Sequence, residues 1–106
     1  MPKYLIEAKY TAEGAKAVMR DGGTGRRSAV AKALEAVGGR LECFYFAFGA
    51  SDAYVIADLP DNVTAAAMAF AVGQSGMAST KTTVLLTCEE ADQATKKSIP
   101  YRAPGS

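Results

Sequence analysis

The sequence contains no histidine. Without an imidazole side chain there is no histidine-ligated metal or haem, no Ser-His-Asp or Cys-His pair and no histidine general base. Any catalysis would have to use tyrosine, lysine, arginine, aspartate, glutamate or cysteine. We therefore predict that the protein has no metal site and no cofactor.

Cysteines and long apolar runs are also scarce. The two cysteines, Cys43 and Cys88, lie far apart and outside any metal-ligand spacing. Free thiols in a reducing compartment are the simplest interpretation. No segment approaches the ~18 consecutive apolar residues of a membrane span, and no signal-peptide pattern follows Met1. We expect a cytoplasmic protein with no membrane partner.

Charge of neither sign is in excess. Lysine and arginine number 12 and aspartate and glutamate 11, so the net charge is +1. This balance offers no general attraction to nucleic acid or to an anionic membrane. Hydrophobic residues make up 49% of the 106 residues, and a chain of this length buries roughly 65% of its unfolded surface. We therefore expect one globular domain without a nucleic-acid partner.

Alternation, helical periodicity and chain breakers divide the chain into strands and helices. The glycines of Asp21-Gly22-Gly23 separate two helical segments, which together form one broken helix. Asp61 supplies a capping side chain for a later helix, and Thr87 and Glu90 have the spacing of a capping box that begins a short terminal helix. Strands are predicted over residues 4–10, 41–48, 53–59 and 80–87, and the longer helices over 11–19, 24–37 and 63–72.

This order of elements predicts the fold. A strand, helix, strand, strand, helix, strand succession with right-handed crossovers gives a four-stranded antiparallel sheet with helices on one face. The predicted class is α+β, with the ferredoxin-like β-α-β-β-α-β arrangement and an extra C-terminal helix. Pro100 and Pro104 stiffen the end of the chain. We expect one domain over residues 1–97 and an extended tail over residues 98–106.

Both faces of the predicted sheet are apolar, although two helices can cover only one of them. A contiguous apolar patch that remains usually marks an interface or a pocket. We therefore predict a homo-oligomer, a dimer or a multiple of a dimer, that buries Phe44 or Phe46 between chains. In the alternative, the terminal helix and tail fold back over this face in a monomer. Strict alternation assigns to the face away from the helices Leu5, Glu7, Lys9, Glu42, Phe44, Phe46, Tyr54, Ile56, Asp58, Lys81, Thr83 and Leu85.

Several short motifs carry a family resemblance over nearly the whole chain. They are Pro2-Lys3-Tyr4, Gly38-Gly39-Arg40-Leu41-Glu42 before Phe44-Tyr45, Phe48-Gly49 before Asp52, Asp58-Leu59-Pro60-Asp61-Asn62, and Tyr101-Arg102-Ala103-Pro104-Gly105. The chain resembles the GYD domain family of small, functionally uncharacterised bacterial proteins. The resemblance implies a ferredoxin-like domain related to dimeric α/β-barrel proteins, and it supplies no catalytic residues. Ser51 stands where the family's name motif has its tyrosine, so a role of that hydroxyl does not carry over.

A set of polar and aromatic residues on or near the predicted open face forms the candidate ligand pocket. Convergent polar groups in an apolar cavity are the usual signature of a small-ligand site. The alternative is a set of interfacial salt bridges, such as Glu7 with Lys9 or Lys81. The candidates are Lys9, Phe44, Phe46, Asp52, Tyr54 and Lys81.

The glycine-rich break is a second candidate site. Gly23, Thr24, Gly25 and Arg26 combine free backbone N–H groups, a helix N-terminus and an arginine, which suit an anion such as phosphate. The segment lacks the Gly-Lys-Ser/Thr ending of a Walker loop. The alternative interpretation is a flexible break between two helical pieces.

Three functional hypotheses follow. The first is a homo-oligomeric binding or assembly module with a small-ligand pocket between subunits. The second is a cofactor-independent enzyme of the dimeric α/β-barrel type (a small monooxygenase, decarboxylase or isomerase) that uses Tyr54, Lys81 or Asp52 as acid or base. The third is a regulatory domain that binds a phosphorylated ligand at the Gly22–Arg26 break. The sequence does not decide whether the protein is an enzyme.

Overall fold

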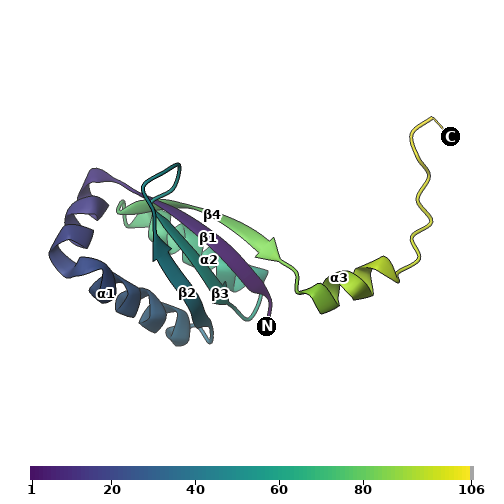
Figure 1. The fold of residues 1–106 in the computed structure, drawn as a ribbon, viewed down its shortest axis with the longest axis horizontal. Helices are drawn as coiled ribbons and strands as arrows, with labels where there is room; N and C mark the ends of the chain where they lie inside the picture. The colour runs from purple at the N-terminus through teal and green to yellow at the C-terminus, as the bar shows by residue number, and fades with distance from the viewer. Residues whose placement is uncertain (106) are drawn as a thin grey trace.

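A four-stranded antiparallel sheet and three helices make up this α+β fold, seen in a computed structural model that describes residues 1–105 (Figure 1). The strands lie in the order β2-β3-β1-β4, and all three pairings are antiparallel. This arrangement is compatible with a ferredoxin-like fold. Ser106, the last residue of the predicted tail, lies outside the described residues. The elements are β1 (Lys3–Tyr10), α1 (Ala12–Ala36), β2 (Arg40–Phe46), β3 (Ala53–Asp58), α2 (Asn62–Gln74), β4 (Ala78–Leu85) and α3 (Cys88–Thr95).

The helix boundaries follow from local hydrogen bonds that the sequence predicts. Asp61 caps α2, because its carboxylate accepts a hydrogen bond from the backbone N–H of Thr64 at 2.8 Å. Thr87 and Glu90 form the predicted capping box at the start of α3. Within α1, Gly22 has φ 75° and ψ 167°, a conformation outside the helical region. The predicted broken helix is therefore confirmed, with its break at Gly22.

One core lies between the sheet and the helices α1 and α2. The largest fully buried side chains are those of Tyr4, Leu34 and Leu59, which come from β1, α1 and the chain after β3. Tyr4 keeps its hydroxyl satisfied by donating to Oδ1 of Asn62 at 2.6 Å, at the start of α2. Both helices therefore pack on the same face of the sheet, and no helix within residues 1–105 lies over the opposite face. The buried cluster consists of Tyr4, Leu34, Val55, Ala57, Leu59 and Ala65.

A β-bulge in β2 changes which side chains face the core. Leu41 pairs with Ala57, but the next paired residue of β2 is Cys43, which lies opposite Ile56. The extra residue reverses the alternation beyond this point. Phe44 consequently packs against the core, and the ring of Phe46 lies against Gly23 of α1. The prediction that Phe44 and Phe46 occupy the open face, and with it their predicted burial between chains through that face, is wrong because it assumed unbroken alternation.

The end of the chain leaves the body of the protein. Every residue from Leu86 to Gly105 is exposed, and α3 and the tail extend away from the sheet (Figure 1). The radius of gyration is 16.8 Å, against about 13 Å for a compact domain of this length. The alternative in which this segment, here called the C-terminal arm (Leu86–Gly105), covers the open face of its own chain is therefore wrong.

Candidate functional site

The open face of the sheet, turned away from α1 and α2, consists of rows of side chains that cross all four strands. Directly paired residues point to the same face, so the rows can be read from the strand register. An apolar row lies between two rows that carry charge. The rows are Tyr45-Tyr54-Glu7-Lys81, then Cys43-Ile56-Leu5-Thr83, and finally Arg40-Asp58-Lys3-Leu85.

The charges of the last row are balanced with the help of Glu42. Nζ of Lys3 donates to Oδ1 of Asp58 at 2.9 Å and also to the carboxylate of Glu42, while Nη2 of Arg40 donates to Oδ2 of Asp58 at 3.3 Å. The hydrogen bond from Lys3, opposed by burial and helped by Arg40, holds the pKa of the Asp58 carboxyl below its usual value. The Glu42 and Asp58 carboxylates raise the pKa of Lys3. This end of the face is a structural ion-pair network.

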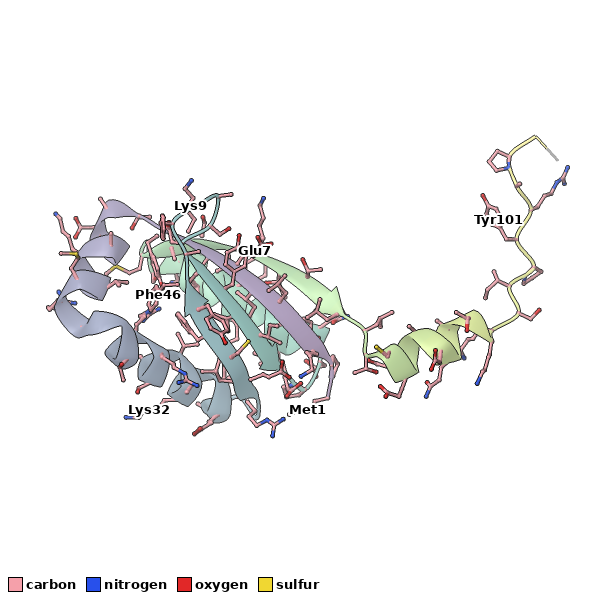
Figure 2. All side chains as sticks on the ribbon, in the orientation of Figure 1. Met1, Glu7, Lys9, Lys32, Phe46 and Tyr101 are labelled. Atoms are coloured by element: carbon pink, nitrogen blue, oxygen red, sulfur yellow. The ribbon has the colours of Figure 1, made fainter. Side chains whose placement is uncertain are left out.

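The opposite end of the face has a hollow that is lined by charged side chains. Figure 2 shows Glu7 and Lys9 on β1, near the loop between β2 and β3. Within residues 1–105, none of Glu7, Lys9 and Lys81 forms an ion pair. Two ammonium groups against one carboxylate give a local excess of positive charge. The hollow, of about 390 Å³, is lined by Glu7, Lys9, Ala50, Ser51, Ser79, Thr80 and Lys81.

Three of the six predicted pocket residues are brought together by the fold. Lys9 and Lys81 line the hollow, and Tyr54 lies in the row of Glu7 and Lys81. Phe44 and Phe46 lie on the helix-covered face instead. Their places on β2 of the open face are taken by Cys43 and Tyr45.

Asp52 does not belong to this group. Its carboxylate accepts a hydrogen bond from the backbone N–H of Tyr10 at 2.8 Å, and its side chain lines a different hollow beside Met19 and Phe46. Of the acid–base groups in the enzyme hypothesis, Tyr54 and Lys81 remain on the open face. In the structure, Asp52 links the loop between β2 and β3 to β1 by a hydrogen bond.

Some residues that line the hollow carry no clear signal in the sequence. Glu7 is predicted there only as a salt-bridge partner, and Ser51 only as the position where the family motif has tyrosine. Ser51 is buried and lines the hollow, so a small side chain leaves space at this point. Ser79 lies opposite Lys9 in the β1–β4 register. No motif in the sequence marks Ser79, because its position depends on strand register alone.

The glycine-rich break places its candidate residues in different surroundings. Gly23 lies against the ring of Phe46, and Thr24 and Gly25 are exposed. The side chain of Arg26 lines a separate cavity between α1 and α2. The backbone break and the arginine therefore face different neighbours.

The fold forms no cluster of metal-binding side chains in the part of the chain that the structure describes. Among residues 1–105, no three or more aspartate, glutamate, cysteine or histidine residues are grouped so that they could hold a metal ion. In the same range, no helix has both the length and the apolar character needed to cross a membrane.

Comparison with known proteins places the chain in a family. The model of the GYD domain family matches residues 4–95, from β1 to the end of α3. No curated protein and no solved structure matches the chain. The matched segment includes the strands and helices that form the core and the open face, except for Lys3, the first residue of β1. The chain belongs to the GYD domain family.

Proposed function

We propose that this protein is a homo-oligomeric binding module, a dimer or a multiple of a dimer, with a cleft for a small anionic ligand between subunits. In this proposal the ferredoxin-like domains pack open face to open face, in the dimeric α/β-barrel manner. The observation that carries it is the apolar row of Leu5, Ile56 and Cys43 beside a hollow that is lined by two lysines.

The apolar row supports the pairing of two sheets. An antiparallel sheet with a wet face carries polar residues on that face, whereas Leu5, Ile56 and Cys43 lie side by side on neighbouring strands here. Beside them, Tyr45 is 69% exposed. A two-fold symmetric interface would place this row against its own copy. No described segment of the same chain covers these residues, because the C-terminal arm points away from the sheet.

The lysines support an anionic ligand. A hollow on an isolated subunit is open to water, and its charges are screened. A second subunit over the open face would exclude water and strengthen the attraction between Lys9, Lys81 and an anion. Lysine binds carboxylate or phosphate as a point charge with freely rotating donors. Ser51 and Ser79 add hydroxyl groups that can donate to the same ligand.

A single substitution tests the interface. Ile56→Lys places a charge in the middle of the apolar row, so we expect a folded monomer in size-exclusion chromatography with light scattering. Val63→Lys is the matched control, because Val63 is 79% exposed on α2 and lies outside this face. Wild-type protein that elutes as a monomer across micromolar concentrations would rule out the proposed assembly.

A second pair of variants tests the ligand. Succinate and inorganic phosphate serve as anionic probes, and binding is measured by the shift in melting temperature. Lys81→Met should reduce the shift, whereas Lys32→Met, an exposed lysine of α1, should leave it unchanged. Native mass spectrometry of the wild-type protein reports the subunit number and any retained ligand. Equal shifts in both variants would place the anion elsewhere.

A further inference from the structure

A second cavity lies on the other side of the sheet, between α1 and α2. Its volume is about 320 Å³, within the range of small-ligand pockets. Both pieces of the broken α1 contribute to it, with Gly14 before the break at Gly22 and Arg26 after it. The lining residues are mostly apolar and include Ala17, Arg26, Ala33, Met68, Ala71 and Val72.

Gly14 and Met77, which both line this cavity, belong to segments that pack tightly through their backbones. The backbone N–H of Thr11 donates to the carbonyl oxygen of Met77 at 3.0 Å. A Cβ atom on Gly14 would lie 1.9 Å from the same oxygen, so only glycine allows this approach. Because Met77 precedes β4, the contact fixes the start of α1 against the sheet. The start of α1 is therefore held beside the chain that leads into β4, at one side of the cavity.

Three residues with polar side chains line the cavity: Tyr10, Arg26 and Ser75. The hydroxyl of Ser75 is already engaged, since it donates to the carbonyl of Val72 at 2.6 Å and accepts from the N–H of Met77 at 3.2 Å. Arg26 is partly buried, and within residues 1–105 its guanidinium has no ion-pair partner. Within residues 1–105 no side-chain nitrogen or oxygen is both buried and without a hydrogen-bond partner, so the donors of Arg26 are open to solvent and available to an anion.

We infer that the cavity between α1 and α2 binds a small amphipathic monocarboxylate, with its aliphatic chain between the helices and its carboxylate on Arg26. The planar guanidinium matches a carboxylate with two parallel hydrogen bonds. The lining of Ala17, Met68 and Val72 suits an aliphatic chain. A single cation favours a ligand with one negative charge. This site is separate from the proposed anion cleft, because it lies between α1 and α2 and not on the open face.

Octanoate is the probe for this inference, and isothermal titration calorimetry is the measurement. Octanol lacks the carboxylate and acetate lacks the chain, so both should bind much more weakly than octanoate. Arg26→Gln should weaken octanoate binding about tenfold or more, the loss expected for a hydrogen-bonded charge pair. Arg27→Gln is the matched control, because Arg27 is exposed and does not line the cavity.

Two further variants distinguish binding in this cavity from binding on the open face. Ala71→Phe, at an exposed position of α2 that lines the cavity, should fill the space and abolish binding while the protein stays folded. Lys81→Met, on the open face, should leave octanoate binding unchanged. Equal affinity in Arg26→Gln and wild type, or loss of binding in Lys81→Met alone, would overturn the inference. So would the absence of saturable binding at millimolar octanoate.

Discussion

The carboxylate of Asp52 accepts a hydrogen bond from the backbone N–H of Tyr10 at 2.8 Å, across the end of β1. The main chain of Asp52 is tied as well, because its N–H donates to Ala8 and its carbonyl accepts from Ala47, both at 2.8 Å. The loop between β2 and β3 is therefore held to the end of β1. A carboxylate that resembles a ligand-binding group in the sequence has a structural role in the fold.

Substitution of Asp52 tests this role. Asp52→Ala removes the acceptor, and the backbone N–H of Tyr10 loses this hydrogen bond. The free energy of unfolding should therefore fall by about 1.5–3 kcal/mol. Asp52→Asn retains a carbonyl oxygen that can accept the same hydrogen bond, and it should lose less. Urea unfolding at neutral pH measures both values. If the two variants were equally stable, the hydrogen bond would not be the source of the effect.

The bulge in β2 predicts opposite results for two neighbouring aromatic residues. Phe46 packs on α1 and is 43% exposed, so Phe46→Ala should lower the free energy of unfolding by about 1–3 kcal/mol, less than for a fully buried phenylalanine. Tyr45→Ala, on the open face, should chiefly weaken self-association.

Urea unfolding and light scattering distinguish these two effects. If Tyr45→Ala destabilised the fold and Phe46→Ala dissociated the oligomer, the register beyond the bulge would be the reverse of that described.

Two glycines of α1 should respond oppositely to alanine. A Cβ on Gly14 would meet the carbonyl of Met77 at 1.9 Å, so Gly14→Ala should cost about 1–3 kcal/mol through overpacking. At Gly25 the nearest neighbour of such an atom is Cβ of Asp21 at 3.6 Å, an ordinary contact. Gly25→Ala should stabilise the protein by about 0.5–1 kcal/mol through the reduced entropy of the unfolded chain. Thermal unfolding of both variants checks the signs.

The ion-pair network on β1, β2 and β3 predicts an acid dependence of stability. The pKa of Asp58 lies below its ordinary value of 3.8 in the folded chain, chiefly because Lys3 donates a hydrogen bond to it. The carboxylate thus stabilises the fold at pH values above 3.8. This stabilisation is lost as the pH falls through the lowered pKa, because the unfolded chain binds the proton first.

Asp58→Asn and Lys3→Met should each flatten the fall in unfolding free energy between about pH 5 and about pH 2. Denaturant unfolding across this range measures the slope. A wild-type slope in both variants would show that other groups govern acid unfolding.

The C-terminal arm offers apolar side chains that no described part of its own chain covers. Ile99 and Tyr101 are 71% and 74% exposed, and Pro100 lowers the entropy lost when such a segment docks. We expect the arm to dock on a neighbouring subunit. A chain that ends at Lys97 should therefore self-associate more weakly, as measured by light scattering over a dilution series, while its domain stays folded. Unchanged mass and melting temperature would show that the end of the chain is passive.

Much of the local structure could be predicted because its signals lie within a few residues of one another. Asp61 and Thr87 cap helices through backbone groups three positions further along. Gly22 interrupts α1 because it adopts a positive φ, which glycine does at little cost. The strands of the antiparallel sheet and the helices that connect them follow from such patterns. The α+β class with four antiparallel strands was therefore predicted correctly.

The faces of the sheet could not be predicted in the same way, since they depend on pairing between distant strands. One extra residue between Leu41 and Cys43 moves Phe44 and Phe46 to the core side and Tyr45 to the open side. The alternation within β2 is the same in sequence whether or not the bulge is present. Likewise, the backbone partner of Asp52 and the cavity that Arg26 lines depend on how distant segments of the chain pack together. The sequence alone determined the elements, through short-range caps, breaks and periodicity. The tertiary structure decided which side chains share a site, because cross-strand register and helix packing are set by contacts far apart in the chain.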